Sequence, residues 1–310
     1  MQDKKFIIAV DSSCDMPLKE CKEKDYEAIS FTYAAGDEQH LDSMDPKDFK
    51  KFYQEQRNGK VWKTSQINPQ EYYKFFLKLE EQHLPIIFIS LGSGLSNSVN
   101  NAKLAYEMLL EEGHQLNLFI VDSKLASLGL GLLADRANQY RKEGKSFEET
   151  CKYLDEITPQ LNTFYTTETL TYFARGGRLS KASALIGNAF RINPILDCDP
   201  AGHLRITDKV RGSNRAIKTI IARIKTQVVN PEEQVLYVCH ADAAEKADTL
   251  VARILAEIPF RGVHTTFMGP IIGSHTGPGL VSIYFLGKPR PEKIIPIAEI
   301  NEQLLNTVKG

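Results

Sequence analysis

Cysteine is scarce in this sequence of 310 residues, and the five that occur are widely scattered. Their number is odd and none forms a C-x-x-C pair, so the spacing predicts neither a disulfide framework nor a zinc site. A long apolar run is missing at the start, where only Phe6–Val10 is apolar before Asp11. That run is too short for a signal peptide or a membrane span, so we expect a cytoplasmic protein without stable membrane insertion. The cysteines, which we expect to be reduced and mostly buried, are Cys14, Cys21, Cys151, Cys198 and Cys239.

Several familiar catalytic signatures are also missing. No lysine follows a G-x-x-x-x-G loop and no H-E-x-x-H occurs, so the P-loop and zincin patterns are absent from the sequence. A nucleophile elbow centred on Ser93 would require glycine at 91 and 95, and both positions hold leucine. The segment Gly129–Ala134 matches G-x-G-x-x-A, but it begins eight residues after Val121 rather than at a strand–helix turn. We interpret these glycines as thinning one helix face so that a neighbour can approach.

Charge and composition are typical of a folded globular protein with an ample core. Apolar residues make up 42% and charged residues 25% of a chain whose length favours two domains. The net charge is −1, but the stretch from Arg175 to Lys225 holds eleven lysines and arginines against three aspartates, a local charge of +8. Such a segment is either a solvated face or a docking surface for something anionic, and charge alone favours the solvated face.

The first half of the chain alternates apolar strands with amphipathic helices. Strands are predicted at "KFIIAVDSS", "LPIIFIS" and "LNLFIVDS", each followed by a loop rich in Ser, Asp or Gly. Between them lie helical patterns such as "PQEYYKFFLKLEEQ". This alternation predicts a mainly parallel sheet whose polar loops, after Val10, Ile89 and Val121, share one edge where ligands bind.

The pattern changes near residue 160. β-Branched and aromatic residues precede a short helix that should stop at Gly176-Gly177, and a hairpin turning on "PAG" is predicted after it. We therefore expect an α/β protein with two domains, one with a mainly parallel sheet over 1–160 and a mixed α/β domain over 161–310. The sequence shows no long linker or repeat, and a crevice between the two domains is the default ligand site.

Hydroxyl side chains cluster in loops that could serve helices or anions. As N-caps, Ser96 would begin the helix through Tyr106, and Thr64 or Ser65 the helix through Leu79. Capping does not exclude an anion, because a helix N-terminus carries free amides and a positive dipole end. The hydroxyl loops are 11–15, 64–66, 93–98, 122–124, 176–180 and 273–278.

The stretch Met268–Phe285 holds four glycines, two prolines and His275 between two apolar runs. A backbone opened by glycine and followed by an imidazole and a hydroxyl could cradle an anion, or it could be a simple turn that His275 completes. The other histidines are spread along the chain and form no metal set.

Eight motifs, taken together and in order, resemble the DegV family, the fatty-acid-binding subunits of bacterial fatty acid kinases. The chain departs from the usual L-S-G-T at Leu95–Ser98, and Ser274 stands where threonine is more usual. The motifs are "VDSSCDMP", "TSQINPQEY", "SGLSNSVNNA", "VDSKLASLGLGLL", "YFARGGRLSKASALIG", "NPIL", "KVRGSNRAI" and "GPIIGSHTGPGLVSIYF".

The resemblance implies that the N-terminal domain is Rossmann-like and that the C-terminal domain is α/β. It also implies a long-chain fatty acid, such as palmitate, stearate or oleate, in a tunnel between the two domains. Carried over by position, it implies that Thr64, Ser96 and His275 contact the carboxylate, with the stretch around His275 as a lid. It further implies that a separate ATP-dependent kinase subunit phosphorylates the bound acid, so that this chain has no catalytic residue, cofactor or metal. Secondary head-group contacts would be Ser65, Ser93, Asn97 and Thr276, and kinase-docking residues would be Arg178, Lys209 and Arg211. Leu125, Leu128, Leu185, Ile186 and Phe190 either line the tunnel or are ordinary core.

Two rival functions remain open at this point. Ser96 and His275 could be the nucleophile and base of a hydrolase acting on an acyl ester, although no third, orienting carboxylate is evident. The basic segment could bind nucleic acid, which the lack of interleaved aromatics between Lys209 and Lys225 disfavours.

Overall fold

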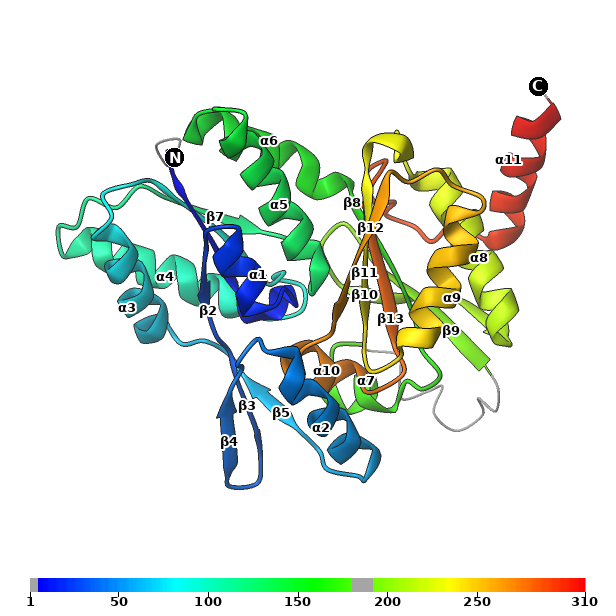
Figure 1. The fold of residues 1–310 in the computed structure, drawn as a ribbon, viewed down its shortest axis with the longest axis horizontal. Helices are drawn as coiled ribbons and strands as arrows, with labels where there is room; N and C mark the ends of the chain where they lie inside the picture. The colour runs from blue at the N-terminus through cyan, green and yellow to red at the C-terminus, as the bar shows by residue number, and fades with distance from the viewer. Residues whose placement is uncertain (1–4, 180–191, 310) are drawn as a thin grey trace.

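The structure, a computed structural model, describes residues 5–179 and 192–309. Within them the chain forms a parallel sheet, a mixed sheet and a small antiparallel sheet. The parallel sheet uses strands that end by Asp122, and the mixed sheet begins at Leu161 (Figure 1). The α/β class expected from the sequence is confirmed.

The parallel sheet has the strand order β2-β1-β6-β7. Every residue of β1 and β6 is buried, which is why these strands are almost uniformly apolar. Their polar loops meet at one edge, as predicted. There the Leu91 amide donates to Asp11 at 2.7 Å, and the Ser93 amide donates to Asp122 at 2.9 Å. The strands are β1 (Ile7–Asp11), β2 (Tyr26–Ile29), β6 (Ile86–Ser90) and β7 (Leu118–Asp122).

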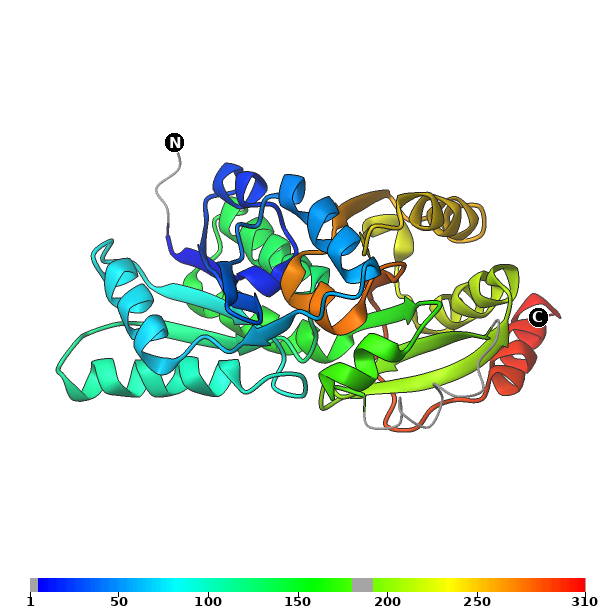
Figure 2. The same ribbon diagram turned by 90° about the horizontal axis from the view of Figure 1, so that it is seen from below.

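Helices cover both faces of this sheet (Figures 1 and 2). α3 and α4 lie together on one face, and α1, α5 and α6 lie on the other. α3 begins at a capping box formed by Asn68 and Glu71, so the prediction that Thr64 or Ser65 caps this helix is wrong. The helices are α1 (Leu18–Glu23), α3 (Pro69–Glu80), α4 (Ser98–Glu111), α5 (Leu128–Lys142) and α6 (Phe147–Ile157).

A small antiparallel sheet, which the sequence did not predict, carries Thr64. Its order is β4-β3-β5, formed by β3 (Thr32–Ala35), β4 (Glu38–Leu41) and β5 (Lys63–Ser65). Helix α2 (Pro46–Arg57) connects β4 to β5 and packs against the second half of the chain. The Tyr53 hydroxyl donates to the Met268 carbonyl at 3.0 Å, and the Gln56 amide donates to the Gly273 carbonyl at 3.1 Å. The segment that holds Thr64 is thereby tied to the second half.

The mixed sheet has the strand order β10-β9-β8-β13-β11-β12. The predicted hairpin is present: β9 and β10 pair antiparallel around Gly202, which adopts φ +92°. α8 and α9 bury apolar faces against one side of the sheet, and α11 packs on α8. The strands are β8 (Leu161–Thr166), β9 (Ile192–Cys198), β10 (Leu204–Arg211), β11 (Val235–His240), β12 (Gly262–Phe267) and β13 (Val281–Leu286). The helices are α7 (Thr171–Gly176), α8 (Ser213–Gln227), α9 (Ala244–Leu255), α10 (Pro270–Thr276) and α11 (Ile297–Lys309).

Helix α5 lies between the two large sheets, where one hydrophobic core joins them. A Cβ at Gly129 would come within 3.4 Å of Tyr284, and one at Gly131 within 3.1 Å of Met16, so the glycines do thin a helix face for neighbours. Leu125 and Leu128 are fully buried in this core. Leu185, Ile186 and Phe190 lie outside the described residues.

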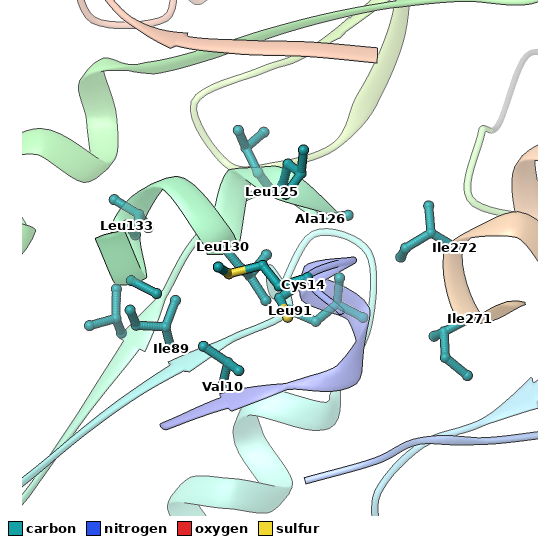
Figure 3. Close-up of a cluster of buried hydrophobic side chains, with 14 of the residues drawn as sticks. Val10, Cys14, Ile89, Leu91, Leu125, Ala126, Leu130, Leu133, Ile271 and Ile272 are labelled. Atoms are coloured by element: carbon teal, nitrogen blue, oxygen red, sulfur yellow. The ribbon is translucent and has the colours of Figure 1, made fainter. Parts of the chain in front are cut away.

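The stretch around His275 forms a short helix rather than a simple turn. Pro270–Thr276 forms α10, which starts with proline in its first turn and ends at Gly277 with φ +72°. Most of α10 is buried, with Ile271 and Ile272 facing the core cluster of Leu91 and Ala126 (Figure 3). Gly269 and Gly277 flank this helix, and Gly273 lies within it against Tyr53, which is why a pattern rich in glycine looked like a loop.

Candidate functional site

The shortest link between the predicted site residues joins Thr64 to His275. Thr64 Oγ1 lies 2.8 Å from His275 Nε2, although 211 positions separate them. Thr64 is held on β5 by its pairing with Tyr33, and His275 is held in the last turn of α10. The tertiary packing of α2 on α10 brings the two elements together.

His275 is a neutral imidazole at physiological pH. Burial and, to a smaller extent, the positive charge of Arg178 together lower its pKa to about 4. Among the residues that the structure describes, no atom pairs with its Nδ1. The ring therefore makes its one polar contact with Thr64.

Ser96 and Arg178 complete the polar end of the site. Ser96 follows β6, and its hydroxyl accepts a 3.2 Å bond from the Ser98 amide at the start of α4. The N-cap of α4 is Asn97, so the prediction that Ser96 caps this helix is wrong, although Ser96 still accepts from its first turn; α4 runs to Glu111 and not only to Tyr106. Arg178 Nε donates to the Leu95 carbonyl at 3.3 Å, and Nη1 donates to the Gly176 carbonyl at 2.6 Å.

These polar groups lie where an inner pocket meets two outer clefts, and the other residues that line the inner pocket are mostly apolar. Its volume is about 70 Å³, room for several water molecules at ~10–15 Å³ each. That is below the ~300–1,000 Å³ of ordinary ligand pockets, so a long ligand would have to spread the lining. The lining residues are Phe31, Thr64, Ser65, Gln66, Leu91, Leu95, Ser96, Ala126, Tyr165, Phe173, Arg178, Leu204, Ile271, Ile272, His275 and Thr276.

Two larger clefts adjoin the polar end from outside. One, of about 530 Å³, includes Thr64, His275 and the cations Lys63 and Arg175. The other, of about 550 Å³, includes Ser96 and His203. Arg178 lines both clefts and the inner pocket, and no aspartate or glutamate is among the described residues that line any of the three. The electrostatics at the place where the inner pocket and the two clefts meet favour an anion.

The remaining predicted head-group residues divide between the pocket and the outer cleft. Ser65 and Thr276 line the inner pocket, where the Thr276 hydroxyl donates to the Ile272 carbonyl at 3.2 Å. Ser93 and Asn97 line the second cleft only. Ser93 accepts a 2.9 Å bond from Lys124, which keeps its hydroxyl oxygen engaged there.

The predicted docking residues do not form one patch. Arg178 lies at the pocket, whereas Lys209 and Arg211 are exposed on the edge strand β10. Arg211 is seven positions from Leu204, the end of β10 at the pocket, or about 23 Å at ~3.3 Å per residue.

Part of the basic segment is also neutralised internally. Arg205 forms two bonds with Asp197, at 2.6 and 3.0 Å, and Arg223 bonds Asp208 at 2.6 Å. Both aspartates are already subtracted in the local charge of +8, so the pairs leave that net charge unchanged and show only that Arg205 and Arg223 are engaged within the fold.

Arg178 and Gln66 are pocket residues whose place the sequence reasoning missed. Gln66 completes the "TSQ" motif, and Arg178 follows the glycine pair at which α7 ends. The signal in the sequence that could have identified both as pocket residues is their position inside the motifs.

No nucleophile–base pair forms at Ser96 in the described residues. The Nε2 of His275 contacts Thr64 instead, and no carboxylate supports Nδ1. The described residues also contain no cluster of three or more metal-ligating side chains, and none of their helices is long and apolar enough to cross a bilayer.

A family model described as "Uncharacterised protein, DegV family" matches residues 5–288. The chain belongs to the DegV family. A DegV domain-containing protein of Clostridium perfringens is 33% identical over 285 residues, which cover 92% of this chain and 98% of that protein. Another, from Clostridium acetobutylicum, is 31% identical and covers 91% of this chain and 99% of its own length.

Solved DegV structures share the fold. A DegV lipid binding protein of Thermotoga maritima is 27% identical with a TM-score of 0.80, covering 93% of this chain and all of that one. DegV of Bacillus subtilis, described as a fatty acid binding protein, is 25% identical with a TM-score of 0.79, covering 92% and 100%. DegV proteins of known structure thus include proteins that bind lipids and fatty acids.

Proposed function

We propose that this DegV chain binds a long-chain fatty acid, with the tail in the inner pocket and the carboxylate on Thr64, Ser96 and His275. The observation that carries the proposal is the set of polar groups where the inner pocket meets the outer clefts. Hydroxyl donors and Arg178 stand at one end of an apolar pocket, without a carboxylate among the described lining residues. Fatty acid binding is described for another protein of Thermotoga maritima with this fold and for DegV of Bacillus subtilis, which supports the same ligand class.

The energetics favour such a ligand. A tail with about 14 methylenes gains roughly 11 kcal/mol gross, at about 0.8 kcal/mol per CH₂ buried. Ordering of the chain and its immobilisation offset much of that gain. A carboxylate left unpaired would cost several kcal/mol, so donors at the pocket end are required.

We further propose that the chain presents the carboxylate, in the cytoplasm, to a separate ATP-dependent kinase that forms the acyl phosphate. Neutral hydroxyls hold the head group without a tight ion pair, and the outer clefts leave it accessible from the side of Arg178. Lys209 and Arg211, exposed on β10, would meet an acidic surface of the kinase.

Native mass spectrometry tests the first proposal. The purified protein, incubated with oleate or palmitate, should carry one bound mass equal to that acid. A spectrum that shows only the unliganded protein after both incubations would refute fatty acid binding.

The kinase step is tested with ATP, a fatty acid kinase catalytic subunit and oleate-loaded protein, by trapping acyl phosphate with hydroxylamine. The double variant K209E/R211E should lower hydroxamate formation at least about tenfold while oleate binding stays unchanged. The matched variant K19E/K22E, with two exposed lysines of α1 reversed, should react as the wild type does. Equal rates for all three proteins would contradict docking through β10.

A further inference from the structure

Gly176, at the end of α7, faces the imidazole ring of His275. A Cβ built on Gly176 would lie 2.5 Å from Nδ1, closer than real Cβ contacts come. Gly176 is not among the residues with positive φ, so its backbone does not require glycine. The imidazole ring, and not the chain conformation, is what excludes a side chain at this position.

This contact decides which ring nitrogen carries the proton. With the proton on Nδ1, a buried N–H would point at a C–H bond of Gly176 and find no acceptor among the described residues. With the proton on Nε2, the Nδ1 lone pair faces that C–H bond, which is a weak attraction. The charge of Arg178 favours the neutral ring, which carries a single proton, over the imidazolium.

The proton on Nε2 in turn sets the direction of the hydrogen bond between His275 and Thr64. Thr64 Oγ1 then accepts the 2.8 Å bond from His275, and its own hydroxyl proton is free to donate into the pocket. Ser96 is arranged in the same way, because its oxygen accepts from the Ser98 amide at 3.2 Å. Both hydroxyls are therefore donors at the pocket end.

Acceptors are few at this end of the pocket. No aspartate or glutamate occurs among its described lining residues, and the Gln66 side-chain oxygen accepts from Asn101 at 3.4 Å. A carboxylate takes donors on every lone pair, whereas an alcohol or a primary amide brings protons that need acceptors.

We propose that Gly176 is a positioning residue that fixes His275 in the Nε2–H form, and that this directs the Thr64 hydroxyl proton into the pocket and makes the pocket end selective for a carboxylate over an alcohol or amide of equal chain length. This selectivity rests on the proposed fatty acid function, whereas the proton position of His275 does not.

Nitrogen NMR of the ligand-free protein tests the proton position directly. Long-range ¹H–¹⁵N correlations of the histidines, with His275 assigned by its loss in H275Q, should show a protonated Nε2 and an unprotonated Nδ1. A protonated Nδ1 would overturn the proposal, whatever the protein binds.

A double-mutant cycle tests the role of Gly176, read out by displacement of cis-parinaric acid with oleate, oleyl alcohol and oleamide. Wild type should prefer oleate by about tenfold or more, and G176A should lose that preference because the ring is pushed from Thr64. G176A/H275A should bind oleate as H275A does, since the methyl group then has room.

G262A is the matched control, because a Cβ at Gly262 meets nothing within 4 Å, and it should bind as wild type does. The proposal would be overturned if G176A lowered oleate affinity equally in the wild type and in H275A. It would also be overturned if the wild type bound oleate and oleyl alcohol with equal affinity. A wild type that binds none of the three lipids would instead refute the proposed function, and the NMR result would still decide the proton position.

Discussion

The carboxylate of Asp15 accepts a 2.8 Å hydrogen bond from the backbone amide of Gly269, which directly precedes helix α10. The two residues are 254 positions apart, so this bond joins the first half of the chain to the helix that carries His275. Burial raises the pKa of Asp15 to about 8, and the nearby Asp42 carboxylate adds to the rise. The folded protein therefore keeps a proton on Asp15 that the unfolded chain releases near pH 4.

The first prediction concerns the pH dependence of stability. Between about pH 4 and 8 the folded state binds one more proton at Asp15, so this group lowers the unfolding free energy by up to ~1.4 kcal/mol for each unit of rising pH. D15N keeps an acceptor for Gly269, and asparagine tolerates the φ of +54° at this position. The unfolding free energy of D15N relative to wild type, from urea titrations, should therefore rise across this range.

D37N provides the control for that series, because Asp37 is exposed in the turn between β3 and β4. The difference in unfolding free energy between D37N and the wild type should stay constant with pH. A flat difference for D15N as well would show that Asp15 is ionised in the folded protein throughout.

The second prediction concerns the hydroxyl of Thr64. T64V keeps the shape and β-branching of the side chain but removes the donor and the bond to His275. Oleate affinity should fall about 10- to 100-fold, the effect of one hydrogen bond to a charged group. Displacement of cis-parinaric acid measures it, with T265V on the exposed face of β12 as the control. Unchanged oleate affinity in T64V would show that the Thr64 hydroxyl does not contact the carboxylate.

The third prediction concerns Gly277, which ends α10. A Cβ there would lie 2.0 Å from Tyr172 Cδ2, and φ is +72°, so G277A combines overlap with backbone strain. Gly279 in the same loop has φ +88° and no atom within 4 Å of a built Cβ, so G279A carries the strain alone. Denaturant unfolding should show a loss of about 1–2 kcal/mol for G279A and a further ~1–3 kcal/mol for G277A. Equal losses would mean that Tyr172 moves aside freely.

Sequence reasoning reached the parts of this fold that local patterns encode. The strands β1, β6 and β7 are apolar runs, buried throughout in β1 and β6, and the polar loop after each run is short, so the shared edge followed from the parallel arrangement. The hairpin at Gly202 and the end of α7 at Gly177 were predicted because glycine marks a positive φ at both turns.

The parts it missed depend on contacts between distant segments. β5 has three residues and gains its partner only from β3, so Thr64 looked like a helix cap. α10 has seven residues and is buried on most sides, so it shows no amphipathic period and resembled a loop. The position of Arg178 at the pocket follows from its bonds to the Leu95 and Gly176 carbonyls, which no charge count reveals.

The last prediction concerns Asp135 on α5, the helix between the two large sheets. Its carboxylate accepts from the Tyr26 hydroxyl of β2 at 2.8 Å, from the Tyr237 hydroxyl of β11 at 2.5 Å and from Lys24 at 2.7 Å. D135A would leave two largely buried hydroxyls and an ammonium group without this acceptor, whereas D135N keeps one acceptor oxygen and replaces the other with an NH₂ donor. We expect D135A to lower the unfolding free energy by about 3–5 kcal/mol and D135N by clearly less. Urea unfolding at pH 7 measures both, with the single variants Y26F and Y237F expected to cost about 1 kcal/mol each. A D135A loss no larger than that of either tyrosine variant would mean that water replaces the carboxylate and that this cluster does not join the sheets.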